Sequence, residues 1–118
     1  MDWKNEVFLG HLYSILWLYE DQYNCYKKAF NMLSEPPEAL ILLLAGCDNS
    51  TSLNKNISEN LLFEAVNKKI TYEAAIMMRA LYRRKHDIQK ENHWGTICKE
   101  LKDKNVHSEI IIPDVLNS

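Results

Sequence analysis

The chain has 118 residues, a length typical of one domain and sufficient to bury a core without metals or disulfides. Apolar residues make up 47% and charged residues 25%, which is ordinary for a globular domain in water. The formal net charge is −2 and the pI is near 6.1, so the whole chain has no bias towards nucleic acid or an anionic membrane. The charge is uneven, however: residues 1–60 carry four Lys or Arg and eight Asp or Glu, whereas residues 61–118 carry ten and eight.

The three cysteines, Cys25, Cys47 and Cys98, are far apart in the sequence and form no CxxC pair. Their odd number and wide spacing favour reduced, partly buried thiols in a reducing compartment. The first residues are acidic and aromatic, unlike a secretory signal. The apolar run near them is about ten residues, half of what a membrane span needs. The sequence therefore predicts a cytoplasmic protein that has no membrane partner.

Glycine and proline are scarce, with three of each, and their scarcity favours long helices. Asp2 can cap a first helix, which is predicted over residues 3–33. Apolar and aromatic residues recur along it every three or four positions, so they share one face that should pack in the core. These residues are Phe8, Leu12, Ile15, Tyr19, Tyr23, Tyr26, Phe30 and Leu33.

Shorter elements are predicted after Pro36 and Pro37. A buried apolar helix follows these prolines and ends near Gly46, and residues 47–56 form a polar loop. Further helices are predicted over residues 58–68, 71–90 and 94–104. Three consecutive isoleucines before Pro113 favour an extended tail over residues 106–118, either laid over the helices or left free for a partner. The predicted fold class is all-α, a compact single-domain bundle of four to five helices with a short extended C-terminal tail.

The predicted first helix has more apolar surface than one face can use. Tyr13, Leu16, Trp17 and Leu18 lie largely outside the core stripe. A helix that is apolar on more than one face is either central in its fold or half of an interface. Interfaces favour tyrosine and tryptophan, because each buries a large area and keeps one polar group.

The preferred hypothesis is therefore a non-catalytic protein-binding module, such as a small inhibitor, adaptor or immunity-type protein. Tyr13 and Trp17 would be its anchors. Glu6, Glu20 and Asp21 would form a polar rim that favours a basic partner. The same surface could instead join two copies in a homodimer.

The alternative hypothesis is a helical nucleic-acid-binding regulator. Basic residues of the predicted helix over residues 71–90 recur at steps of four, three and four, so they share one face. Such a face can follow a phosphate backbone with an affinity that falls with salt. A solvated outer face explains the same pattern without a ligand. The stepping residues are Arg79, Arg83, His86 and Lys90, and Arg84 and Lys85 add to the positive charge.

Arg79 and His86 are separated by six residues. This spacing resembles the Arg-x4–6-His signature of the HEPN ribonucleases, which are also small helical bundles. The resemblance implies that these two residues would serve RNA cleavage. It covers only these two positions, and Ala80 stands where those enzymes usually carry a polar residue.

Other chemical motifs are absent from the sequence. It contains no phosphate-binding glycine loop and no G-x-S-x-G nucleophile motif. The residues best able to bind a metal do not have the spacing of a zinc site. The sequence therefore predicts no enzyme, no cofactor and no metal. The four residues best able to bind a metal are His86, His93, Cys98 and His107.

Overall fold

The computed structural model describes residues 2–51 and 55–114, with side chains outside residues 48–57. These residues form six α-helices and no strand, so the all-α class is confirmed and the predicted number of four to five helices is wrong. The helices are α1 (Trp3–Ile15), α2 (Tyr19–Asn31), α3 (Glu38–Thr51), α4 (Lys55–Lys68), α5 (Tyr72–Arg84) and α6 (Ile88–Asp103).

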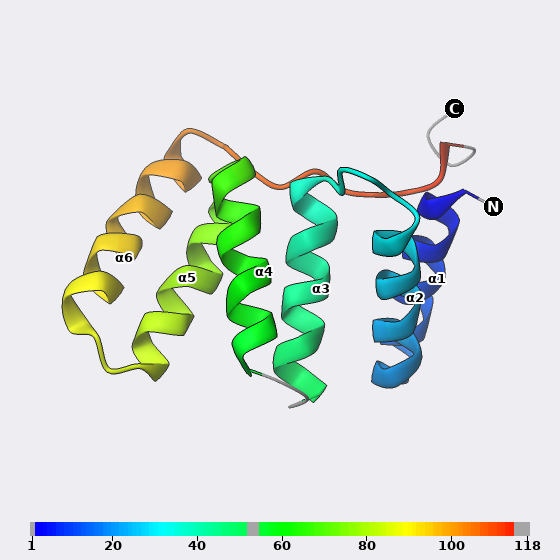
Figure 1. Cartoon of the computed structure of the whole chain (residues 1–118). Helices are drawn as coiled ribbons and strands as arrows, with labels where there is room; N and C mark the ends of the chain where they lie inside the picture. The colour runs from blue at the N-terminus through cyan, green and yellow to red at the C-terminus, as the bar shows by residue number, and fades with distance from the viewer. Residues whose placement is uncertain (1, 52–54, 115–118) are drawn as a thin grey trace.

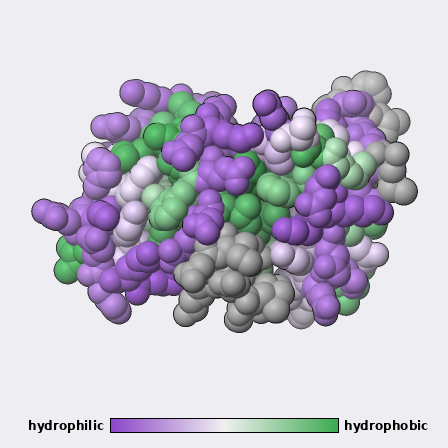
Figure 2. All heavy atoms as spheres, viewed as in Figure 1, coloured by the Kyte–Doolittle hydropathy of each residue, from purple (hydrophilic) through white to green (hydrophobic). Residues whose placement is uncertain are grey.

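The helices form three antiparallel hairpins that lie side by side (Figure 1). α1 packs on α2, α3 on α4 and α5 on α6, and contacts of α2 with α3 and of α4 with α5 join the hairpins. The core centres on α3, where Leu40, Ile41 and Leu44 are fully buried. Figure 2 shows mostly hydrophilic residues on this face, with hydrophobic residues visible near its centre and in smaller groups towards both ends. The apolar helix predicted after Pro37 is therefore the middle of the core.

The predicted helix over residues 3–33 is wrong, because the chain turns at Trp17. α1 ends in a Schellman cap, in which the Leu18 N–H donates to the Tyr13 carbonyl at 2.9 Å and the Trp17 N–H to the Ser14 carbonyl at 3.1 Å. Trp17 has a φ of 60°, the left-handed conformation that glycine usually supplies. Three members of the predicted core stripe are exposed, namely Leu12, Ile15 and Tyr19.

The same cap ends α5 and α6. His86 follows α5 and Asn105 follows α6, each with a φ of 58°. In the first of these caps the Asp87 N–H donates to the Tyr82 carbonyl at 3.0 Å. As a result α5 ends at Arg84 instead of near residue 90, and α6 starts at residue 88 instead of 94. The predicted helices over residues 71–90 and 94–104 therefore had wrong bounds.

The polar loop predicted over residues 47–56 is also wrong in its bounds. α3 continues through Gly46 to Thr51, and α4 begins at Lys55. Gly46 does not have the positive φ with which a glycine ends a helix. Residues 52–54 of the predicted loop lie outside the described residues.

Residues 106–114, here called the C-terminal strap, cross one end of all three hairpins (Figure 1). The predicted tail has no regular secondary structure over residues 106–113, and it lies over the helices of its own chain (Figure 1). Residues 115–118 lie outside the described residues. The side chain of Ile111 is 6% exposed and joins the core, and Lys4 Nζ of α1 lies 2.8 Å from Asp114 Oδ1.

A buried carboxylate fastens the strap to the middle and last hairpins. Glu38, the first residue of α3, accepts hydrogen bonds on one oxygen from Thr71 Oγ1 at 3.0 Å and Ser108 Oγ at 2.9 Å. Thr71 also accepts the Ala74 N–H and so caps α5. Glu73 of α5 accepts the Ser108 backbone N–H at 2.8 Å. One cluster thus joins the start of α3, the start of α5 and the strap.

We expect Thr71→Val to lower the free energy of unfolding by about 2–3 kcal/mol, because it removes an N-cap and a hydrogen bond to a buried carboxylate. Urea denaturation followed by circular dichroism measures this loss. Thr71→Ser keeps the hydroxyl and should lose only about 0.8 kcal/mol for the methyl group. Equal losses in the two variants would mean that the methyl group of Thr71 contributes as much as its hydroxyl.

Candidate functional site

The connection between α1 and α2 exposes five consecutive large apolar residues. Their side chains are between 44% and 78% exposed, and Trp17 is the most exposed of the five. A solvated helix end normally has polar residues at such positions, and a contiguous apolar patch on a protein surface marks an interaction site. Residues 15–19 are here called the aromatic tip, and they are Ile15, Leu16, Trp17, Leu18 and Tyr19.

The backbone of the aromatic tip is held in one conformation. The left-handed Trp17 would be more stable as glycine, since a bulky side chain at positive φ is strained. Strain of this kind persists only where the surroundings enforce it, and it clusters at functional sites. Here the two hydrogen bonds of the α1 cap enforce it. The effect is to point a large aromatic side chain away from the helices and into solvent.

Two of the predicted rim acids border the aromatic tip and one does not. Glu20 and Asp21 are exposed in the first turn of α2, where the helix dipole favours negative charge. Glu6 is buried within the hairpin and pairs with Lys28 of α2 at 3.3 Å, so its predicted place on the rim is wrong. Tyr13 is half-buried near the end of α1.

Sequence reasoning selected Trp17 but missed most of the tip. Ile15 and Tyr19 were assigned to the core stripe, because a continuous helix was assumed through residue 17. Leu16 and Leu18 were noted as surplus apolar surface without a location. The excess of apolar residues on every side of the predicted helix was the one signal for the tip, and no glycine marked the turn.

Close packing between α1 and α2 fixes the hairpin beneath the tip. The ring of Tyr26, 1% exposed, lies against Gly10 so closely that a Cβ on Gly10 would be 2.5 Å from Tyr26 Cε1. The Tyr26 hydroxyl lies 2.6 Å from His11 Nδ1. Gly10 therefore serves as a contact surface for a buried tyrosine, and the helix continues through it.

We expect Gly10→Ala to destabilise the protein by about 1–2 kcal/mol, because overpacking against a buried ring outweighs the higher helix propensity of alanine. Gly46→Ala is the matched control, since an added Cβ there has no atom within 4 Å. That control should be stabilised by about 0.5–1 kcal/mol. Thermal unfolding of both variants distinguishes the two effects. Stabilisation by Gly10→Ala would show that the Tyr26 ring can move aside.

The partial burial of His11 disfavours its charged form. Burial lowers the pKa of His11 below its ordinary value of 6.5, and a hydrogen bond to the backbone of Ile111 opposes this shift only in part. The unfolded chain therefore takes up a proton at a higher pH than the folded chain does. Stability is lost as the pH falls below about 6.5, since the unfolded state then binds more protons.

We predict that the free energy of unfolding falls between pH 7 and pH 5, and that His11→Gln removes the part of this fall that begins near pH 6.5. Glutamine keeps a donor and an acceptor but does not titrate in this range. Urea denaturation at a series of pH values measures both curves. Identical pH dependence in the two proteins would assign the loss to other groups.

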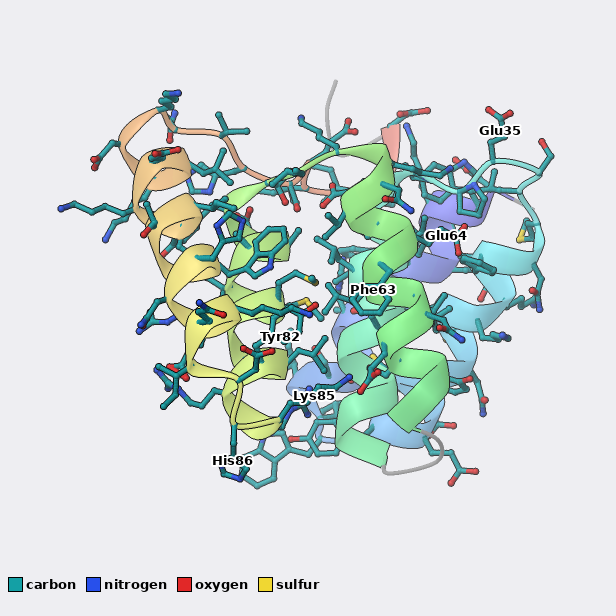
Figure 3. All side chains as sticks on the ribbon, turned by 60° about the vertical axis from the view of Figure 1, so that its left-hand side comes forward. Glu35, Phe63, Glu64, Tyr82, Lys85 and His86 are labelled. Atoms are coloured by element: carbon teal, nitrogen blue, oxygen red, sulfur yellow. The ribbon has the colours of Figure 1, made fainter. Side chains whose placement is uncertain are left out.

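The basic residues do not form the single face that the sequence predicted. Because α5 ends at Arg84, Lys90 belongs to α6 and stands over the ring of Tyr82 at 5.2 Å. Arg83 pairs with Glu91 at 3.2 Å, and Lys85 reaches α4 to pair with Glu59 at 3.1 Å. Lys85 lies near α4, and His86 projects from the end of the α5–α6 turn (Figure 3). Arg79, Arg83, Arg84, Lys85 and Lys90 are all exposed.

The two residues that resemble the ribonuclease signature lie on different elements. The Arg79 side chain lies next to Gly95 of α6, since an added Cβ on Gly95 would be in ordinary contact with Arg79 Nε at 3.7 Å. His86 occupies the turn beyond α5 in the left-handed conformation. The continuous helix that would place both on one face is absent.

The described part of the chain contains no metal site and no disulfide. No three His, Cys, Asp or Glu side chains there could hold a metal ion together. Cys25, Cys47 and Cys98 are buried and form no disulfide, and burial raises the pKa of the Cys25 and Cys98 thiols. Among the helices as far as they are described, none is long and apolar enough to cross a membrane.

Comparison with known proteins adds no assignment: no protein-family model, curated protein or solved structure matches this chain.

Proposed function

We propose that this protein is a non-catalytic protein-binding module that uses the aromatic tip as its contact surface. The observation that carries the proposal is the exposure of residues 15–19, above all of Trp17, which is 78% exposed. The burial of such side chains by a partner removes a large apolar area from water. Their exposure without a partner is unfavourable for solubility.

The chemistry of the tip favours a protein partner. Tryptophan and tyrosine are the residues that most often anchor protein interfaces. Trp17 would be the main anchor, with Tyr13 and the aliphatic side chains of the tip around it. Glu20 and Asp21 would meet basic residues at the edge of the contact and speed association. An inhibitor, an adaptor and an immunity-type protein all work in this way, and a second copy of the chain is an eligible partner.

The basic residues support the nucleic-acid alternative less well. Arg83 and Lys85 are each paired with a glutamate of the same chain, and the basic side chains are distributed over α5, its turn and α6. A cytoplasmic location is part of the same proposal, in keeping with three buried cysteines that form no disulfide.

We expect Trp17→Gly to abolish partner binding and to keep or raise stability. Glycine accepts the left-handed conformation freely, so relief of strain should raise the free energy of unfolding by about 1 kcal/mol. The measurement combines urea denaturation with affinity capture and mass spectrometry, comparing wild type with Trp17→Gly. A true partner is captured by the wild type, lost by Trp17→Gly and then confirmed by titration calorimetry.

Ile88→Ser is the matched control, because Ile88 is 72% exposed at the start of α6, directly after the other described hairpin turn. This variant should keep the partner. A partner that binds Trp17→Gly as well as it binds wild type would contradict the proposal. Salt-sensitive binding of labelled RNA or DNA that Arg83→Glu abolishes would favour the nucleic-acid alternative instead.

A further inference from the structure

A pocket of about 370 Å³ lies between the C-terminal strap and the α1–α3–α5 side of the array. Its lining contains no residue of the aromatic tip, and it is formed by three helices and by the strap. Its volume is at the lower end of the range for small-molecule sites. Its walls are mainly aliphatic, and they include Leu42 and Leu43 of α3, Met77 of α5, and Ile110 and Ile111 of the strap.

The charged groups of this pocket are of one sign. Glu73 of α5 and Glu109 of the strap are part of its lining, and none of the described lining residues is lysine or arginine. Glu73 is held in place by the Ser108 backbone N–H and by His107 Nδ1, each at 2.8 Å. These hydrogen bonds lower the pKa of Glu73 against the opposing effect of its partial burial, so this carboxylate remains ionised near neutral pH.

The remaining titratable group does not offset this negative charge. His11 of α1 contributes to the lining, its Nδ1 is occupied by the Tyr26 hydroxyl at 2.6 Å, and its burial favours the neutral ring. His107, the hydrogen-bond partner of Glu73, does not line the pocket. Lys4 of α1 interacts with Glu109 from outside this lining, where its ammonium group is paired with Asp114 at 2.8 Å. An apolar pocket whose lining includes carboxylates and no lysine or arginine is complementary to an apolar molecule that carries a positive charge.

We propose that this pocket binds a small amphipathic cation, namely an alkylammonium whose chain fills the aliphatic part and whose ammonium group lies near Glu73 and Glu109. The volume holds roughly a dozen water-sized groups at about 30 Å³ each, and octylammonium, with nine non-hydrogen atoms, fits within it.

The test is a titration of the full chain labelled with ¹³C at its methionine methyl groups. Met77 lines the pocket and Met32, at the end of α2, is a distant internal reference. Octylammonium should shift the Met77 methyl signal saturably and leave Met32 unchanged. Octanol should bind more weakly by roughly two- to fivefold, the contribution of an exposed ion pair. Octanoate should bind more weakly still.

Glu109→Lys should reverse the order, so that octanoate binds more tightly than octylammonium. Glu64→Lys is the matched control, because Glu64 is an exposed glutamate on α4 outside the pocket (Figure 3), and this variant should keep the order of the wild type. Absence of a Met77 shift with any of the three ligands would overturn the proposal. Equal affinity for octylammonium and octanoate would contradict the proposal that the ligand is a cation. Binding only of a lysine-containing peptide would assign the pocket to a protein partner instead.

Discussion

The arrangement of the last two hairpins and the strap depends on one buried carboxylate. Glu38 would be costly to bury alone, since an ionised group without partners loses its hydration. Two hydroxyl groups from distant parts of the chain, those of Thr71 and Ser108, supply the missing hydrogen bonds. The requirement for these partners fixes the start of α3, the start of α5 and the path of the strap together. The pocket beside the strap exists because this cluster holds the strap in place.

The aromatic tip follows from a different constraint, the left-handed conformation at the end of α1. Glycine would make this turn without strain, and a polar residue such as asparagine would leave it soluble. The chain has Trp17 there, between two leucines. Neither the stability of the cap nor its solubility explains that choice. A contact made by the side chain would explain it, and this is why we propose the tip, rather than the basic helix, as the contact surface.

The sequence predicted the helical class and the apolar helix at the core, because the periodicity of apolar residues and the proline restart are strong local signals. It also predicted that the segment around the three isoleucines lies outside the helices. It did not predict the turns at Trp17 and His86, since both caps use residues other than glycine and leave no stop signal. Because the sequence predicts one helix where α1 and α2 are found, it places Ile15 and Tyr19 in the core instead of at the surface. The contact of Ser108 with Glu38 joins residues 70 positions apart, and no periodicity reports such a contact.

The strap also changes how the array should lose its structure. In a linear stack of hairpins each unit contacts only its neighbours, so such a stack can fray from either end and its stability is nearly a sum of local terms. Here a segment that follows the last helix forms an ion pair with Lys4 and packs Ile111 into the core that all three hairpins share. The first and last units are thus linked, and loss of one end releases the other. Unfolding should therefore be more cooperative than three stacked hairpins would otherwise allow.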